Sequence, residues 1–288
     1  NICRYYYTRD IWRPPLHIDM SPVKRMFPFS VKVLVTSIIN TINNNVLTFI
    51  FGNLFPMKTV GNFSQAMKWD TMAYTTISGT IEQVEQPILV EISDDKDREL
   101  RVFRKMMRFT AFITFPLLFG FGLVAKEFIV TAIGEKWLAS AQLIQILCIS
   151  GATMPLSTLF SNMIISKGRS GTFFWCTFTL GLVQIATMIM IWPMGIRTMV
   201  IAYTLLNTSW LLVWLFFVRR LIGYGYWMFF CDVMPFALAA AGVMGVAYVA
   251  TMPLSNLIAL LISRFIIAVV LYYAVMTVSY QHFTLPTN

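Results

Sequence analysis

Residues 61–105, GNFSQAMKWDTMAYTTISGTIEQVEQPILVEISDDKDRELRVFRK, decide the fold, because they include a segment of membrane-spanning length that carries acidic residues. At helical spacing one face of this segment is polar, and it comprises Thr75, Ser78, Glu82, Glu85 and Gln86. The opposite face is apolar and comprises Ala73, Ile77, Ile81, Val84 and Ile88. Pro87 is expected to kink or end the helix, and a charged run follows it. A helix with an acidic stripe in so apolar a chain is predicted to line a hydrated space.

The composition is that of a membrane protein. Of the 288 residues, 57% are hydrophobic and 12% are charged, and the mean hydropathy is +0.69, whereas a soluble domain carries about 25% charged residues. The charges are clustered, so that several long ranges contain none: 33–57, 137–166, 170–196 and 198–218. Each range is at or above the roughly 20 residues that a spanning helix needs. The sequence therefore predicts an all-α integral membrane protein.

About eight transmembrane helices are expected. Their predicted ranges are 29–51, 67–91, 109–131, 139–165, 171–193, 198–218, 231–252 and 255–277. Pro116 and Pro155 fall inside two of these spans and are expected to kink them. The basic range 93–108 is predicted to be a connecting loop.

The net charge of +9 does not indicate a nucleic-acid binder, because the Lys and Arg residues lie in the connections between apolar segments. When they are counted on alternate sides of the membrane, sixteen fall on one side and five on the other. The richer side is predicted to be cytoplasmic, which also places both termini of the chain in the cytoplasm. The range 93–108 is then a topology determinant that rests on anionic lipid, with a dedicated partner site as the alternative.

The sequence offers no catalytic or metal-binding pattern. The four cysteines are scattered without a CxxC pair, and the two histidines lie near the ends of the chain. There is no nucleophile–base pair and no phosphate-cradling loop. We therefore expect neither an enzyme nor a metal site nor a cofactor.

An ordered series of short motifs resembles the polysaccharide-export flippases, which include the O-antigen flippases of lipopolysaccharide biosynthesis and belong to the multidrug/oligosaccharidyl-lipid/polysaccharide (MOP) superfamily. The matching residues are Gly61, Phe63 and Ala66; Pro87 with the Ser-Asp-Asp that ends at Asp95; the FPL that begins at Phe115; the GEKW that begins at Gly134; Pro155; and the GRS that begins at Gly168. The resemblance covers roughly residues 30–220, in order and at matching spacing. No single motif is specific, and the ordered set is the stronger signal.

The resemblance implies a transporter of two helical bundles, of which this chain is the second, with extra helices at the C-terminus. Residues 1–28 would be a cytoplasmic loop that ends a missing N-terminal half. Residues 29–220 would form a six-helix bundle, and residues 221–288 two additional spans and a short cytoplasmic tail.

The family moves undecaprenyl-pyrophosphate-linked oligosaccharides across the bacterial inner membrane by alternating access, for lipopolysaccharide, capsule or exopolysaccharide synthesis. The implied partners are the lipid-linked substrate, membrane lipids and a polysaccharide polymerase or export machinery. The alternative on the same fold is a multidrug or cation antiporter of the multidrug and toxic compound extrusion type.

Glu82 and Glu85, with Gln86 beside them, are the main candidates for the transport cavity. Intramembrane carboxylates are costly and usually functional, and these would take up a proton or sodium ion that drives the bundles. Alternatively, they contact sugar hydroxyls of the substrate, or they are solvated near the cytoplasmic end of the helix or paired with the basic range that follows. Asn44 and Asn45 line the cavity or hydrogen-bond between helices.

Arg264 is the one charge inside the last predicted span. It is expected either to bind a pyrophosphate or to serve as a structural charge, paired with an acid or extended to the membrane interface.

Overall fold

The computed structural model describes residues 20–91, 95–254 and 256–284, although not every side chain within α2, α3 and α10 is described. The described residues form helices joined by short turns, without a strand. The long helices of the first half are α2 (Ser21–Leu54), α3 (Met57–Glu91) and α4 (Lys96–Ile133). The short helices η1 (Glu135–Trp137), α5 (Leu138–Gly151) and α6 (Met154–Ser166) follow. The second half contains α7 (Ser170–Ile191), η2 (Trp192–Met194), α8 (Ile196–Ile222), α9 (Tyr226–Thr251) and α10 (Leu257–Thr284).

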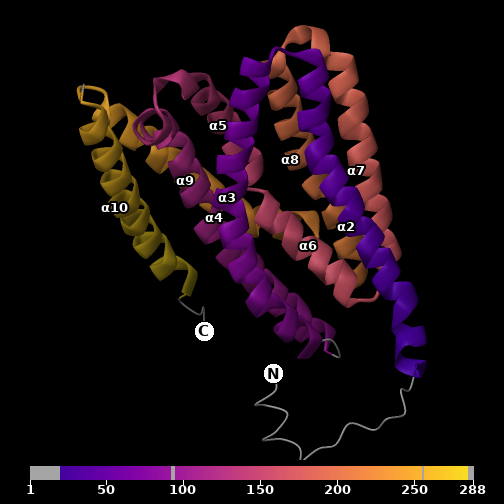
Figure 1. Cartoon of the computed structure of the whole chain (residues 1–288). Coiled ribbons are helices and arrows are strands. Elements are labelled where there is room, and N and C mark those ends of the chain that lie inside the picture. The colour runs from indigo at the N-terminus through magenta and orange to yellow at the C-terminus, as the bar shows by residue number, and fades with distance from the viewer. Residues whose placement is uncertain (1–19, 92–94, 255, 285–288) are drawn as a thin grey trace, which may run out of the picture.

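The helices form one bundle in which α4 and α5 are central (Figure 1). In this view α10 lies at one side of the bundle and α2 and α7 at the other. Helix α4 packs against α5, α9 and α10, while α3 packs against α5 and α6, and α2 packs mainly against α7.

Six helical segments of the described part are long and apolar enough to cross a membrane. They span 97–133, 135–166, 170–194, 196–222, 226–251 and 257–277. Helices α2 and α3, of 34 and 35 residues, also have the length to cross. The predicted all-α fold is confirmed.

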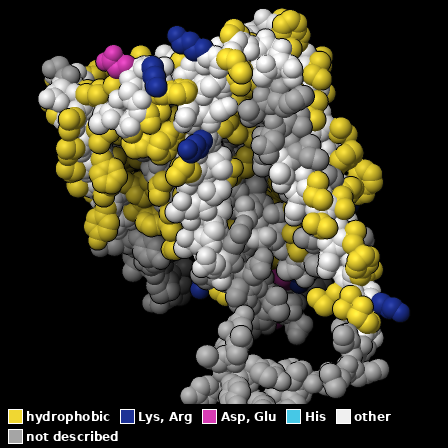
Figure 2. Space-filling view, viewed as in Figure 1, with side chains coloured by type: hydrophobic (Ala, Val, Ile, Leu, Met, Phe, Trp, Pro, Cys, Tyr) yellow, Lys and Arg dark blue, Asp and Glu magenta, His cyan; other side chains and the backbone are white. Residues whose placement is uncertain are grey.

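The outer surface is apolar, as lipid contact requires. Large hydrophobic side chains are widely exposed, among them Met190 and Trp227, each with 80% of its surface accessible. Figure 2 shows hydrophobic side chains along the outward faces of the helices, with few Lys and Arg between them. An apolar surface of this extent marks contact with a membrane rather than water. The chain is an integral membrane protein.

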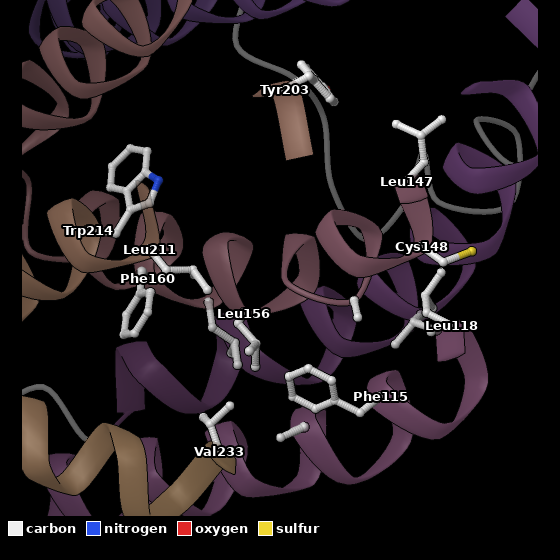
Figure 3. Packing of buried hydrophobic residues seen from close by; sticks show 14 of the residues in the cluster. Phe115, Leu118, Leu147, Cys148, Leu156, Phe160, Tyr203, Leu211, Trp214 and Val233 are labelled. Atoms are coloured by element: carbon white, nitrogen blue, oxygen red, sulfur yellow. The ribbon is translucent and has the colours of Figure 1, made fainter. Parts of the chain in front are cut away.

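The core is densely packed around the α5–α6 pair. Figure 3 shows side chains from α4, α5, α6, α8 and α9 gathered there. Phe115 and Leu118 of α4, Leu147 of α5 and Phe160 of α6 are buried, with at most 5% of their surface exposed.

The range 93–108 is helical from Lys96 onward, so the prediction of a loop was wrong for most of it. This helix begins at an N-cap residue, Asp95. The side chain of Asp95 accepts hydrogen bonds from the backbone N–H groups of Asp97 and Arg98, at 3.0 Å each. Asp97 and Glu99 then place negative charge in the first turn, where the helix dipole favours it.

The predicted span 139–165 is divided into α5 and α6 by a turn at Ala152 and Thr153. Pro155 stands at the start of α6 and has no N–H to offer the carbonyl of Gly151, so a continuous ladder is broken there. Pro116, by contrast, lies within the unbroken helix α4. Helix α3 runs past Pro87 to Glu91, so Pro87 does not end it.

Candidate functional site

The predicted cavity residues divide between two helices. Glu82, Glu85 and Gln86 lie in the C-terminal half of α3, whereas Asn44 and Asn45 lie in α2. Their side chains are outside the part of the chain that the structure describes. Which of them face one another thus stays a prediction.

The described part of the stripe agrees only partly with the predicted faces. Ile77 and Ile81, on the expected apolar face, are buried, and Thr75 on the polar face is exposed. Ser78 was expected on the hydrated face but is buried, with 9% of its surface exposed. Around Ser78, the polar exposed face of α3 is therefore narrower than the sequence pattern predicted.

Asp70 is a buried acid of α3 that the sequence reasoning missed. Only 4% of its surface is exposed, and its Oδ1 atom has no hydrogen-bond partner. The pattern contained a clue, because Asp70 precedes Ala73 and Ile77 by three and seven positions and so belongs to the apolar face. An acid on the face that a helix turns toward its neighbours is placed in the protein interior.

Hydrogen bonds between polar side chains connect α8 to α5 and to α7. The Ser150 hydroxyl, at the end of α5, donates to Thr204 Oγ1 of α8 at 3.5 Å. The Gln184 amide of α7 donates to Asn207 Oδ1 of α8 at 3.1 Å. These interhelical hydrogen bonds satisfy side chains that could not otherwise be buried in an apolar core.

Asp232 of α9 joins two arginines of α4. Arg104 donates from Nε to Oδ2 at 2.8 Å and from Nη2 to Oδ1 at 3.0 Å, and Arg108 donates from Nε to Oδ1 at 2.6 Å. The Tyr224 hydroxyl adds a longer bond to Oδ2 at 3.3 Å. Burial and the charge of Asp232 raise the pKa of Tyr224 well above its usual range, so its hydroxyl stays protonated and donates.

Two further ion pairs connect α4 to its neighbours. Lys167, which follows α6, lies 2.8 Å from the buried Glu99 carboxylate of α4. Arg264 of α10 donates from Nη1 to Glu127 Oε1 of α4 at 2.8 Å and from Nε to Thr251 of α9 at 3.1 Å. Arg264 is thus held by groups on two other helices, α4 and α9.

The arginine-rich start of α4 therefore has a structural role in addition to any effect on topology. Arg104 and Arg108 stand one turn apart on one face of the helix and converge on one carboxylate. No sequence pattern identified this partner, because Asp232 is more than 120 residues away.

The acids, cysteines and histidines of the described part do not cluster as a metal site would require. Cys148 and Cys176 are buried free thiols, and Cys231 is exposed. The chemistry that the arrangement supports is the burial and pairing of charge within a helical membrane body.

These features define a class: a multi-pass helical membrane protein with the fold of a flippase. The structure aligns with the lipid II flippase MurJ in its inward closed conformation, with a TM-score of 0.71 at 15% identity. The alignment covers 94% of this chain and 57% of that one. At this identity the likeness shows the fold.

The sequence comparisons find relatives in polysaccharide biosynthesis. Residues 2–142 match the family described as polysaccharide biosynthesis protein. The chain is 31% identical over 166 residues to an uncharacterised membrane protein in the cps region of Klebsiella pneumoniae, which covers 58% of this chain and 33% of that protein. It is 28% identical over 165 residues to the lipopolysaccharide biosynthesis protein WzxC of Escherichia coli, covering 57% and 33% of the two.

The teichuronic acid biosynthesis protein TuaB of Bacillus subtilis is 24% identical over 235 residues, covering 81% of this chain and 49% of that protein. The chain thus spans a third to a half of the length of the curated relatives that it matches. The chain is thus similar in sequence to polysaccharide biosynthesis proteins and in fold to a lipid flippase, as the resemblance of its motifs predicted.

Proposed function

We propose that this chain forms one of two bundles of a flippase that moves undecaprenyl-pyrophosphate-linked oligosaccharide from the cytoplasmic to the periplasmic leaflet of a bacterial inner membrane. The observation that carries the proposal is the combination of a flippase fold with relatives named for lipopolysaccharide and teichuronic acid biosynthesis. Residues 29–220 would be the six-helix bundle, and residues 221–288 would add two spans. The cytoplasmic loop predicted for residues 1–28 would end where α2 begins, because the chain is helical from Ser21 onward.

The physical task is to carry a large polar headgroup through hydrocarbon. A hydrated cavity between two bundles solves it if each bundle rocks as a rigid body, opening the cavity to alternate sides. The ion pairs of α4 support such a body, because they connect α9, α10 and the end of α6 to one helix. Glu82 and Glu85, which fall on α3, would line the cavity beside Gln86, with Asn44 and Asn45 of α2 nearby.

The charge pattern supports an orientation. Arg108 and Glu127 are 19 residues apart on α4, which corresponds to about 28 Å along a helix axis. This separation matches the roughly 30 Å thickness of the hydrocarbon layer. In our proposal the Asp232 pairs lie at the cytoplasmic interface, the Arg264–Glu127 pair lies at the periplasmic interface, and both termini are cytoplasmic.

Complementation tests the proposal. The full-length protein that contains this chain is expressed in a bacterium lacking its own polysaccharide flippase, and surface glycan is measured. We expect rescue by the wild type and loss of rescue with Glu82→Gln or Glu85→Gln at equal protein levels. Glu135→Gln is the matched control, because Glu135 is exposed at the turn after α4.

Each of the other outcomes would correct a different part of the proposal. Rescue by all variants would keep the flippase and remove the two glutamates from its mechanism. Failure of the wild type in hosts of several glycan types, together with new resistance to cationic drugs, would contradict sugar-lipid flipping and favour the antiporter.

A further inference from the structure

Four acidic side chains of the described part are buried: Asp70, Glu99, Glu127 and Asp232. Three of them are paired with a lysine or arginine, all on or against α4. Asp70 is the exception, since no cationic side chain that the structure describes lies within ion-pair distance of it. An ionised carboxyl group that is buried without a counter-charge is costly, so such a group is usually neutralised by other means.

The surroundings of Asp70 contain weak donors and no cation. The titratable groups that interact with it are Tyr74 on its own helix, the Cys148 thiol of α5 and Tyr203 of α8. Helix α6, which also packs against α3, has no titratable residue. The buried acids of α4, Glu99 and Glu127, form ion pairs with Lys167 and Arg264, respectively.

The absence of a side chain at Gly151 leaves room for the carboxyl group of Asp70. It is the last residue of α5, and a methyl group built on it would overlap Asp70 Oδ1 and lie 3.1 Å from its Cγ. Asp70 therefore packs directly against the backbone where α5 ends and the turn to α6 begins.

The end of α5 offers hydrogen-bond acceptors to Asp70. The last carbonyl groups of a helix lack intrahelical partners, and a protonated carboxyl could donate a hydrogen bond to one of them. A carboxylate in the same place would be desolvated without a cationic side chain to compensate it. Thiol and phenol groups also do not form the ring of oxygen ligands that a bound metal cation needs, and no metal-binding cluster is found among the described residues. The proton is thus the simplest cation to neutralise this site.

We propose that Asp70 is a proton-exchange site of the transport cycle. Its carboxyl is protonated while α3 packs against Gly151 at the α5–α6 break, and it releases the proton to water when α3 moves away from that break. The inference rests on the proposed flippase function and supplies its coupling ion. It places the coupling acid inside the bundle, twelve residues from Glu82 and about 18 Å along α3.

Infrared difference spectroscopy tests the site without any sugar substrate. The full-length protein is reconstituted in liposomes of bacterial phospholipid, and the C=O stretch of protonated carboxyl groups is followed during a jump from neutral to alkaline pH. We expect one band in the wild type that is absent in Asp70→Asn and shifted in Asp70→Glu, which keeps the carboxyl. Asp97→Asn, at an exposed acid, should leave the band unchanged.

An identical band in the wild type and in Asp70→Asn would overturn the proposal. So would a band that sodium removes at constant pH, because sodium would then be the bound cation. Asp70→Glu also guards against misfolding of Asp70→Asn, since an unshifted band in a folded Asp70→Glu protein overturns the proposal by itself. Loss of glycan rescue with an intact infrared band would contradict the flippase function instead, so the two failures are distinguishable.

Discussion

Asp232 and Asp70 are the same side chain at nearly the same burial, 0% and 4% exposed, in two different electrostatic settings. Asp232 receives three hydrogen bonds from two arginines, and it joins α9 to α4. Asp70 has no such partner and packs against the end of a helix. A compensated carboxylate holds helices together, whereas an uncompensated one is free to exchange a proton. The predictions below test this difference.

The largest effect should come from the most buried ion pair. Arg264→Met leaves Glu127 buried without a counter-charge, and we expect the free energy of unfolding to fall by about 3–4 kcal/mol. Thermal unfolding of the purified protein, followed by tryptophan fluorescence, measures the change. The double variant Arg264→Met/Glu127→Met should recover most of the loss, because both charges are then gone. A double variant as unstable as the single one would contradict a role based on charge.

Asp232→Asn should lower the free energy of unfolding by less than Arg264→Met does. Asparagine can still accept hydrogen bonds, and the side chains of Arg104 and Arg108 are 32% and 43% exposed, so water can reach them. We expect a loss of about 2 kcal/mol in the same assay. The exposed acid Asp97, changed to Asn, should alter stability by no more than about 0.5 kcal/mol. Equal effects of the two changes would mean that the arginine pairs contribute nothing.

Gly151→Ala tests the contact that distinguishes Asp70. The added methyl group overlaps the carboxyl oxygen, so we expect a loss of about 1–2 kcal/mol, which Asp70→Ala in the same protein should suppress. Gly242→Ala in α9 is the matched control, because nothing lies within 4 Å of its added methyl. Additive effects of the Gly151 and Asp70 changes would show that the two residues do not touch.

The smallest effect concerns the exposed N-cap of α4. Backbone hydrogen bonds, first from Arg98 and then from Asp97, lower the pKa of Asp95. Because the pKa is lower in the folded state, this stabilisation is present above the unfolded pKa and is lost as the pH falls through the folded one. Asp95→Ala should therefore increase amide hydrogen exchange in the first turn of α4 at neutral pH. Acidification should then change that turn less in the variant than in the wild type; an equal change would contradict the cap.

The sequence predicted the features that follow from local pattern. Apolar ranges without charges predicted the helical membrane fold, and the motifs from Gly61 to Ser170 predicted the similarity to polysaccharide biosynthesis proteins. The same local chemistry could have predicted two details that were missed. Asp95 followed by acidic residues starts a helix, and Pro155 after Gly151 breaks one.

The ion pairs could not be predicted from local pattern. Asp232 finds Arg108 across 124 residues, and Glu127 finds Arg264 across 137, so the partners depend on which helices pack together. Asp70 lies in the same helix as the acidic stripe, but it belongs to the apolar face, which is buried at Asp70, Ile77 and Ile81. Its lack of a cationic partner among the described residues is a property of the assembled bundle.

The most direct test of this account compares thermal unfolding of Asp70→Asn and Asp232→Asn at neutral pH. Asparagine resembles a protonated aspartic acid and cannot ionise. We predict that Asp232→Asn lowers the midpoint temperature while Asp70→Asn leaves it unchanged or raises it. If Asp70→Asn lowers the midpoint as far as Asp232→Asn does, Asp70 is ionised and compensated in the folded protein, and the distinction between the two aspartates is wrong.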